Sequence, residues 1–168
     1  MEIIRADNSG FCFGVKKALE TTQDQIKESK ASSSKGSLFT CGPLIHNKIV
    51  TSQLENDGVR IIKTPDEAKE GDTIIVRSHG EPKAFYDRMD RLNLNYVDTT
   101  CPFVSKIHTI VNGACKEGKK IIIIGDANHQ EVIATNGWCD NSAYIINSPD
   151  EVEKVESGEY LVVCQTTI

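Results

Sequence analysis

The order of apolar and amphipathic segments is the feature that most limits the folds open to this chain. Short, almost continuous apolar runs alternate with amphipathic segments along the whole sequence. Such runs are typical of parallel strands that are covered on both faces, and the segments between them then form the connecting helices. The sequence therefore predicts an α/β fold with mainly parallel sheet flanked by helices.

The expected strands and helices follow from the period of the apolar residues and from the positions of glycine and proline. We expect strands at residues 2–6, 37–41, 59–62, 73–77, 95–99, 120–124, 143–146 and 160–164. We expect helices at residues 15–30, 47–56, 65–70, 82–92 and 103–117, one that opens after residues 125–129, and a short one at 149–155. Residues 31–36, which are rich in serine, are expected to form a loop.

This order of elements begins again near residue 96, which predicts two similar lobes rather than one long sheet. We place the first α/β lobe at residues 1–96 and the second at residues 97–168. In this interpretation the strand at 95–99 opens the second lobe. No segment after residues 160–164 has the pattern of a covering helix, so we expect the second lobe to be incomplete.

Composition excludes several classes of protein. The chain has 168 residues, of which 39% are hydrophobic and 26% are charged, as in globular domains rather than disordered chains. Its net charge of −5 argues against a general surface for nucleic acid or anionic membranes. We find neither a signal peptide nor a long apolar run, and we therefore expect a cytoplasmic protein with no membrane partner.

The six cysteines contain no Cys-x-x-Cys pair, so we expect reduced thiols rather than a zinc ribbon or a disulfide framework. Cys12 lies between Gly10 and Gly14, where a predicted strand leads into a helix. The positive end of a helix favours the thiolate, which is both the nucleophile and the metal ligand. Four cysteines are instead expected to be ordinary small, buried residues: Cys41, Cys115, Cys139 and Cys164.

Reactive side chains gather where the predicted strands end. These junction residues are Cys12, His46, His79, Cys101, His129 and Thr166. The carboxyl ends of parallel strands form the edge at which α/β proteins bind ligands. Taken singly, four of these residues are better explained as a helix cap or a turn residue: His46, His79, Cys101 and His129. Such roles do not predict one shared edge. The remaining histidine, His108, is expected to have a packing role on the apolar side of the predicted helix at residues 103–117.

Several kinds of chemistry fit these junction residues. Histidines and helix N-termini bind a diphosphate without a strongly basic surface, and thiolates from separate loops hold iron–sulfur clusters. Glu131, close to His129, is suited to carrying protons. A zinc hydrolase is disfavoured because no H-E-x-x-H motif is present. A dithiol redox protein that uses Cys12 and Cys101, and a diphosphate-binding module without catalysis, remain as alternatives.

Six motifs in register resemble one known family, the LytB family of 4-hydroxy-3-methylbut-2-enyl diphosphate reductases. The motifs occupy residues 10–15, 46–47, 78–80, 98–102, 129–132 and 165–167. The resemblance implies an oxidoreductase of the methylerythritol phosphate route to isoprenoids. It would convert its substrate to isopentenyl and dimethylallyl diphosphate by reductive dehydroxylation. Family members typically have three α/β lobes, and this chain resembles the first lobe and most of the second.

The same resemblance implies roles for two of the cysteines and for several polar residues. Cys12 and Cys101 would be two of the three ligands of a [4Fe–4S] cluster, whose remaining iron binds the substrate's allylic hydroxyl group. Glu131 would head the relay that protonates the substrate, and Thr166 would hydrogen-bond near the substrate hydroxyl. Electrons would come from a ferredoxin or a flavodoxin.

The histidines are implied to line the diphosphate pocket: His46, His79 and His129, the last of which would also move protons. The family's third cysteine and its Ser-x-Asn diphosphate clamp belong to the third lobe, which this chain lacks. We do not expect Cys164 to replace that cysteine, because it lies inside an apolar strand. We therefore expect the 168-residue chain alone to be inactive.

Overall fold

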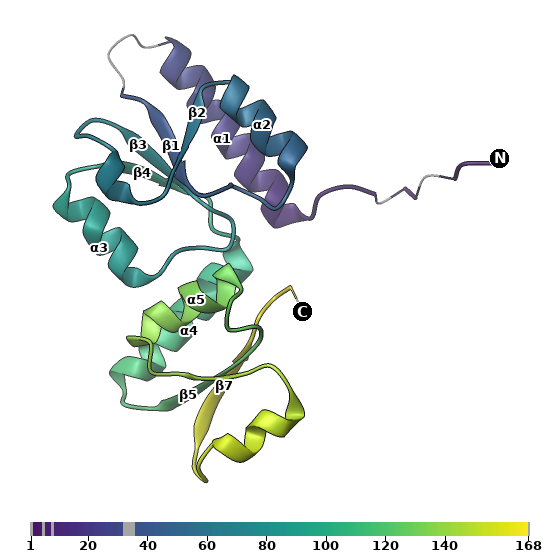
Figure 1. Cartoon of the computed structure of the whole chain (residues 1–168), viewed down its shortest axis with the longest axis vertical. Coiled ribbons are helices and arrows are strands. Elements are labelled where there is room, and N and C mark those ends of the chain that lie inside the picture. The colour runs from purple at the N-terminus through teal and green to yellow at the C-terminus, as the bar shows by residue number, and fades with distance from the viewer. Residues whose placement is uncertain (1, 5, 8, 32–35, 168) are drawn as a thin grey trace.

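The computed structural model describes residues 2–4, 6–7, 9–31 and 36–167. Two parallel sheets follow one another along the long axis of the molecule, and helices lie against both (Figure 1). Every strand pair among the described residues is parallel. The predicted α/β class and the prediction of two sheets are therefore confirmed.

The first sheet has four strands in the order β2-β1-β3-β4. They are β1 (Leu38–Cys41), β2 (Val59–Ile62), β3 (Thr73–Val76) and β4 (Asn95–Asp98). The second sheet has three strands in the order β6-β5-β7. They are β5 (Lys120–Ile124), β6 (Tyr144–Ile146) and β7 (Tyr160–Cys164). These bounds differ from the predicted ones by no more than one residue at either end.

The α-helices are α1 (Phe13–Ala31), α2 (Lys48–Asn56), α3 (Lys83–Arg91), α4 (Pro102–Lys116) and α5 (Gln130–Asn136). Short 3₁₀ helices occur at η1 (Pro65–Glu67), η2 (Gly137–Cys139) and η3 (Pro149–Lys154). Asn47 caps α2, since its side chain accepts hydrogen bonds from the backbone N–H groups of Ile49 and Val50 at 3.1 and 3.2 Å. None of the described helices is long and apolar enough to cross a membrane.

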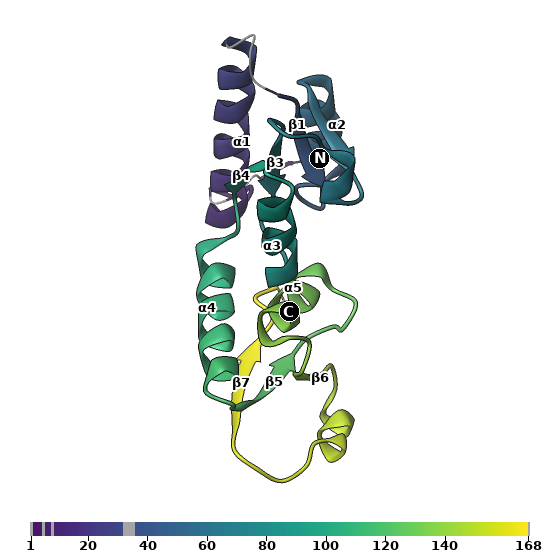
Figure 2. The same ribbon diagram turned by 90° about the vertical axis from the view of Figure 1, so that its left-hand side faces the viewer.

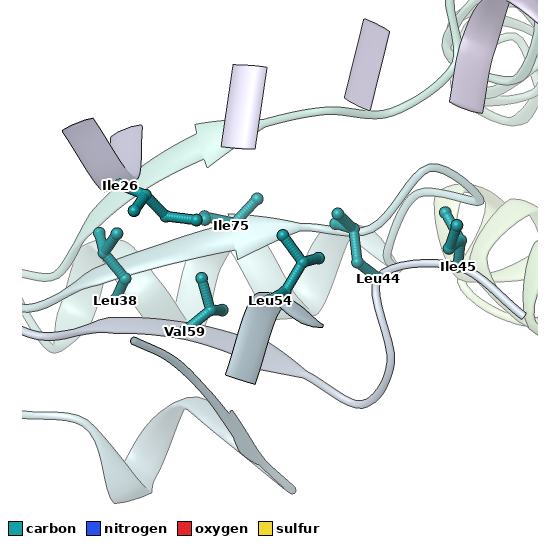
Figure 3. Close-up of a cluster of buried hydrophobic side chains, with 7 residues drawn as sticks. All are labelled: Ile26, Leu38, Leu44, Ile45, Leu54, Val59 and Ile75. Atoms are coloured by element: carbon teal, nitrogen blue, oxygen red, sulfur yellow. The ribbon is translucent and has the colours of Figure 1, made fainter. Parts of the chain in front are cut away.

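Apolar side chains that alternate along the strands of the first sheet explain why both of its faces are covered. One face packs against α1 and α2 through a cluster drawn in Figure 3: Ile26, Leu38, Leu44, Ile45, Leu54, Val59 and Ile75. The other face packs against α3 through a second cluster that includes Phe39, Ile74, Val76 and Met89. A third cluster, separate from both, fills the second sheet around Val111, Ile121 and Ile123.

The predicted strand at residues 2–6 is wrong where the structure describes it. Residues 2–4 and 6 are not in a strand, and Arg5 lies outside the described residues. Ile3 and Ile4 are 80% and 85% exposed, so the apolar pattern there does not reflect burial in a sheet. The predicted loop at 31–36 also falls largely outside the described residues, at 32–35, and Ala31 still belongs to α1.

The strand at residues 95–98 belongs to the first sheet, not to the second as the repeat had indicated. β4 pairs with β3 along its whole length, with Tyr96 opposite Ile74 and Val97 opposite Ile75. A strand joins the sheet that can satisfy its backbone groups, whatever its position in a sequence repeat. The first sheet therefore extends to Asp98, and the division into domains at residue 96 stays a prediction.

Candidate functional site

The carboxyl ends of the two sheets face each other, and the predicted histidines meet between them. His46 follows β1, His79 follows β3 and His129 follows β5. The ring centroids of His46 and His79 lie 4.8 Å apart. The His129 ring lies 6.1 Å from that of His46 and 6.2 Å from that of His79. Residues far apart in the sequence thus form one compact group of three imidazoles.

These rings line a pocket of about 360 Å³, which we call the histidine pocket. Its walls are Phe11, Val15, Ile45, His46, Asn47, Ser78, His79, His129 and Thr167. The walls come from the segment before α1 and the first turn of that helix, from the loops after β1 and β3, and from the loops that follow β5 and β7. A concave site with a few polar groups on an apolar base is typical of a binding site for a small molecule.

His79 is held in its neutral form. Burial lowers its pKa to about 4, and the positive charge of Arg77 and the neighbouring His46 and His129 act in the same direction. Its Nδ1 is buried and has no hydrogen-bond partner among the described residues. Near pH 7 His79 therefore offers one N–H donor, rather than a full positive charge, to a bound molecule.

His129 is fixed at the start of α5 by its own ring. Its Nδ1 accepts a hydrogen bond from the backbone N–H of Glu131 at 3.2 Å, which makes it the N-cap of this helix. A backbone N–H can only donate, so this geometry requires Nδ1 to be unprotonated. The ring then carries its proton on Nε2, which leaves one donor for the pocket.

Glu131 is 3% exposed and is held by the residues that follow β7. One of its carboxylate oxygens accepts the backbone N–H of Thr166 at 2.6 Å, and the other accepts the Thr166 hydroxyl at 2.9 Å. The hydroxyl of Thr167, which lines the histidine pocket, lies 3.4 Å from the carboxylate. The structure thus brings Glu131 and Thr166 together and connects them to the pocket through a second hydroxyl.

Cys12 and Cys101 both directly precede helices whose first turns face each other, as Figure 2 shows for α1 and α4. The backbone carbonyl of Cys12 accepts from Lys16 at 3.0 Å, and that of Cys101 accepts from Ser105 at 2.9 Å. A Cβ atom added to Gly14 would lie 2.7 Å from the Cys101 Sγ. The Cys101 thiol therefore packs against the helix turn that begins beside Cys12.

The donor set at this position matches part of a cluster site. Cys12 is exposed and Cys101 is half-buried, so the first thiol is open to a ligand from outside the fold. Among the described residues, no three His, Cys, Asp or Glu side chains form a group that holds a metal ion. A [4Fe–4S] cluster is held mainly by cysteine thiolates, so these residues fit two of its corners and leave the others to be supplied.

The other cysteines follow the predicted packing roles with one exception. Cys41 and Cys139 are buried, at 6% and 0% exposure, and burial raises the pKa of the Cys41 thiol to about 12. Cys115 is half-buried. Cys164 is exposed, which corrects the expectation of a buried thiol. The reason is that β7 is an edge strand of its sheet, so an apolar sequence there does not imply cover on both faces.

Sequence reasoning assigned no role to several polar residues around the pocket. Asn47, Ser78 and Thr167 line it, and they were included in the family motifs without a role of their own. It also missed an ion pair between Arg77 and Glu81, which is buried at 11% and 8% side-chain exposure. The available signal was Arg77 itself, which directly follows the buried apolar run of β3. A charged side chain next to a buried strand usually has a partner of opposite charge.

Comparison with known proteins gives one consistent result. The family model described as LytB protein matches residues 3–168. Among curated proteins, a 4-hydroxy-3-methylbut-2-enyl diphosphate reductase of Alkaliphilus oremlandii is 46% identical over 169 residues, which cover 100% of this chain and 59% of that protein. The reductase of the same name from Clostridioides difficile is 42% identical, over 100% of this chain and 60% of that protein.

Two solved structures agree with the fold. A Plasmodium falciparum structure named as an E-1-hydroxy-2-methyl-but-2-enyl-4-diphosphate reductase has a TM-score of 0.87 and 30% identity, over 96% of this chain and 50% of that one. A second, titled as the terminal enzyme of the non-mevalonate pathway, has a TM-score of 0.80 and 36% identity, over 99% and 58%. The chain thus spans between half and three fifths of the length of these relatives.

Proposed function

Because this chain belongs to the LytB protein family, we propose that it forms part of a 4-hydroxy-3-methylbut-2-enyl diphosphate reductase. The complete enzyme would remove the substrate's allylic hydroxyl group reductively and yield isopentenyl and dimethylallyl diphosphate. This would be the last step of the methylerythritol phosphate route to isoprenoids. Curated relatives with the reductase name match over 100% of this chain, which supports the proposal.

The observation that carries the proposal is the meeting of three histidine rings with the Glu131–Thr166 pair at one pocket. The rings come from two different sheets, and all three pairs of centroids lie within 6.2 Å. Packing of a single lobe does not require this arrangement. A small molecule that bears both an anionic group and a hydroxyl to be protonated accounts for the two kinds of residue together.

In this proposal the histidines bind the diphosphate through directed N–H groups. His79 is neutral near pH 7 because of its burial, and the His129 tautomer is set by the N–H of Glu131. Neutral donors of fixed direction bind phosphate oxygens without collecting positive charge in the pocket. This is consistent with a chain whose net charge is −5.

Glu131 would hold the proton that is delivered to the leaving hydroxyl group. Its carboxylate is oriented by the N–H and hydroxyl of Thr166 at 2.6 and 2.9 Å. The Thr167 hydroxyl, at 3.4 Å from the carboxylate, lies between this group and the pocket. A hydroxyl both donates and accepts, so it passes a proton from the carboxyl group to the substrate. His129 would help to move protons at the start of the same helix.

Cys12 and Cys101 would hold two corners of a [4Fe–4S] cluster beside this pocket. When bound, the cluster would pass the donor's two electrons to the substrate and would supply a Lewis-acidic iron for the hydroxyl oxygen. The exposed Cys12 thiol and the close contact of Cys101 with α1 fit this role. The electrons would come from a ferredoxin or flavodoxin in the cytoplasm, and the remaining ligand and half of the diphosphate clamp would come from further chain.

The test is the Glu131→Gln variant of the complete gene product, assayed anaerobically. We expect turnover to fall by about 10²- to 10⁴-fold, the usual contribution of a general acid, while binding of inorganic diphosphate is retained. Glu20→Gln, an exposed glutamate of α1, is the matched control and should leave both quantities unchanged.

The outcomes also separate the alternatives. A complete protein that binds diphosphate but never turns over would be a binding module and not a reductase. Normal turnover in Glu131→Gln would remove this residue from the proton path. A reversible Cys12–Cys101 disulfide in iron-free protein, without any iron-dependent activity, would favour the two-cysteine redox protein.

A further inference from the structure

We propose that Arg77 is a positioning residue that holds the three histidine-bearing segments of the pocket in register. The inference rests on the proposed diphosphate site, because it explains how that site is assembled. Arg77 follows β3 directly and is two residues from His79. It does not line the histidine pocket, so any effect on the pocket must act through other residues.

The Arg77 guanidinium is anchored first within its own loop. Its Nε donates to a carboxylate oxygen of Glu81 at 2.7 Å, and its Nη2 lies 2.6 Å from the same oxygen. Both side chains are about nine-tenths buried, at 11% and 8% exposure. Burial raises the Glu81 pKa, whereas the Arg77 charge opposes that shift. A buried pair of this kind fixes the geometry of the loop that carries His79.

The same guanidinium reaches the segment that carries His129. Its Nη2 donates to the side-chain oxygen of Gln130 at 3.2 Å, and Gln130 follows His129 directly. This bond joins the loop after β3 to the first turn of α5, across the boundary between the two sheets. A second contact supports it, since the Trp138 indole N–H donates to the backbone carbonyl of Glu81 at 3.0 Å.

The third segment, which carries His46, meets Arg77 at Gly42. A Cβ atom added to Gly42 would lie 3.0 Å from the Arg77 Nη1, and Gly42 has a φ of +81°. Glycine at this position therefore allows both the turn after β1 and the close approach of the guanidinium. His46 lies four residues further along the same loop.

Arginine suits this task because its planar fork presents five N–H donors in fixed directions. One guanidinium here contacts the loop after β1, the loop after β3 and the start of α5 at the same time. Lysine keeps the charge and the pairing with Glu81 but has a single nitrogen, so it cannot satisfy several partners in one plane. The arrangement of the three imidazole rings therefore depends on the planar shape of the Arg77 guanidinium and not only on its positive charge.

The experiment compares Arg77→Lys and Gln130→Met with matched controls in the 168-residue chain. Arg91→Lys and Gln53→Met are the controls, because both residues are exposed on helices and neither lines the histidine pocket. Affinity for inorganic diphosphate is measured by calorimetry, the histidine ring resonances by NMR, and the unfolding midpoint by thermal melts. Gln130→Met leaves the Arg77–Glu81 pair intact, so it remains informative if Arg77→Lys folds poorly.

We expect diphosphate affinity to fall about tenfold in Arg77→Lys and several-fold in Gln130→Met, as for loss of a hydrogen bond to a charged group. The ring resonances of His46, His79 and His129 should shift in Arg77→Lys while the unfolding midpoint stays close to that of the unchanged chain. The controls should change neither affinity nor resonances. Unchanged affinity in both test variants would overturn the proposal.

Failure of the diphosphate site itself would look different. If the unchanged 168-residue chain binds no inorganic diphosphate, the three histidines are not a sufficient diphosphate site without the rest of the clamp, and the histidine resonances alone then test the role of Arg77. Histidine resonances that are identical in the unchanged chain, Arg77→Lys and Gln130→Met would overturn the positioning role in that case too.

Discussion

At the scale of single residues, His108 shows how burial controls a titratable group outside the pocket. It lies on α4, is 4% exposed and stacks on Trp138 with 5.5 Å between ring centroids. Its Nε2 has no hydrogen-bond partner among the described residues. Burial lowers its pKa to about 4, although the Asp98 charge acts in the opposite direction. The packing role that the sequence indicated is consistent with this environment.

His108 makes the free energy of unfolding depend on pH. The unfolded chain binds a proton at this residue near pH 6.5, whereas the folded chain does so only near pH 4. Stability is therefore highest above pH 6.5 and falls as the pH drops toward 4. Between pH 7.5 and 5 we expect this group to account for a loss of roughly 2 kcal/mol. Urea unfolding at the two pH values measures it.

The His108→Gln variant is the comparison for this effect. It should lose roughly 2 kcal/mol less than the unchanged chain over the same pH interval, because it has no imidazole to protonate. His79, whose pKa is also lowered to about 4 by burial, remains in both proteins and contributes equally. Equal losses in the two proteins would contradict the assigned environment of His108.

At the scale of elements, the starts of α1 and α4 are packed so closely that only glycine fits between them. Gly14 lies in the first turn of α1 and contacts the Cys101 side chain that begins α4. Gly113, in contrast, lies inside α4, and a Cβ atom added there would meet nothing within 4 Å. The two glycines have the same helical backbone but opposite surroundings.

Glycine-to-alanine substitutions at these two positions should therefore have opposite effects. Gly113→Ala should raise the free energy of unfolding by about 0.5–1 kcal/mol, because alanine is the better helix former. Gly14→Ala should lower it by about 1–3 kcal/mol, because its methyl group would overlap the Cys101 thiol.

Chemical denaturation measures both changes, and maleimide labelling should show a faster reaction of Cys101 in Gly14→Ala only. A stabilising Gly14→Ala substitution, with unchanged labelling, would show that α1 and α4 are not in this contact.

At the scale of the whole molecule, the two sheets have separate hydrophobic cores, but loops from both of them line the histidine pocket. The core of the first sheet contains Ile75, and that of the second contains Ile123, which are 0% and 1% exposed. The contacts of Arg77 with Gln130 and of Trp138 with Glu81 cross between the sheets and are polar. Polar contacts of this kind allow each sheet to open separately.

Substitution of each core residue by alanine tests this separation. Ile75→Ala and Ile123→Ala should each cost about 2–5 kcal/mol, because a buried cavity replaces packed atoms. Native-state hydrogen exchange should show lost protection mainly in β1 to β4 for the first variant and mainly in β5 to β7 for the second. Loss of protection across both sheets in either variant would mean that the chain unfolds as one cooperative unit.

The proposed cluster site also belongs to the scale of the whole molecule, because its proposed ligands Cys12 and Cys101 come from different parts of the chain. After anaerobic reconstitution with iron and sulfide, we expect the 168-residue chain to hold no stable four-iron cluster and to show no turnover. Among the described residues, Cys101 packs against Gly14, which lies two residues after Cys12, and no three side chains form a metal-binding group. About four irons per chain together with turnover would refute this expectation.

Cys164→Ser serves as the control for that measurement. This thiol is exposed on β7, and it is not expected to be a ligand. Iron content should therefore be the same with and without it.

The sequence by itself determined the element order from α1 onward, the parallel sheets and the position of every junction residue except Cys12, which follows no strand among the described residues. These follow from local patterns: apolar runs such as residues 120–124 mark a covered strand, and a histidine or cysteine after such a run must lie at its carboxyl end. The same local reasoning failed for residues 2–4 and 6 and for Cys164. An apolar pattern reports a tendency to be buried, whereas the cover itself must come from other parts of the chain.

Only the tertiary structure decided which carboxyl ends meet. Three sets of contacts join residues of different lobes or distant strands. The His129 ring lies close to those of His46 and His79. Thr166 donates a hydrogen bond to Glu131, and Arg77 donates one to Gln130. No local period encodes such contacts, because they depend on how two sheets dock and on buried hydrogen bonds that form only after docking. The pocket is therefore a product of packing, built from residues whose separate positions were already evident in the sequence.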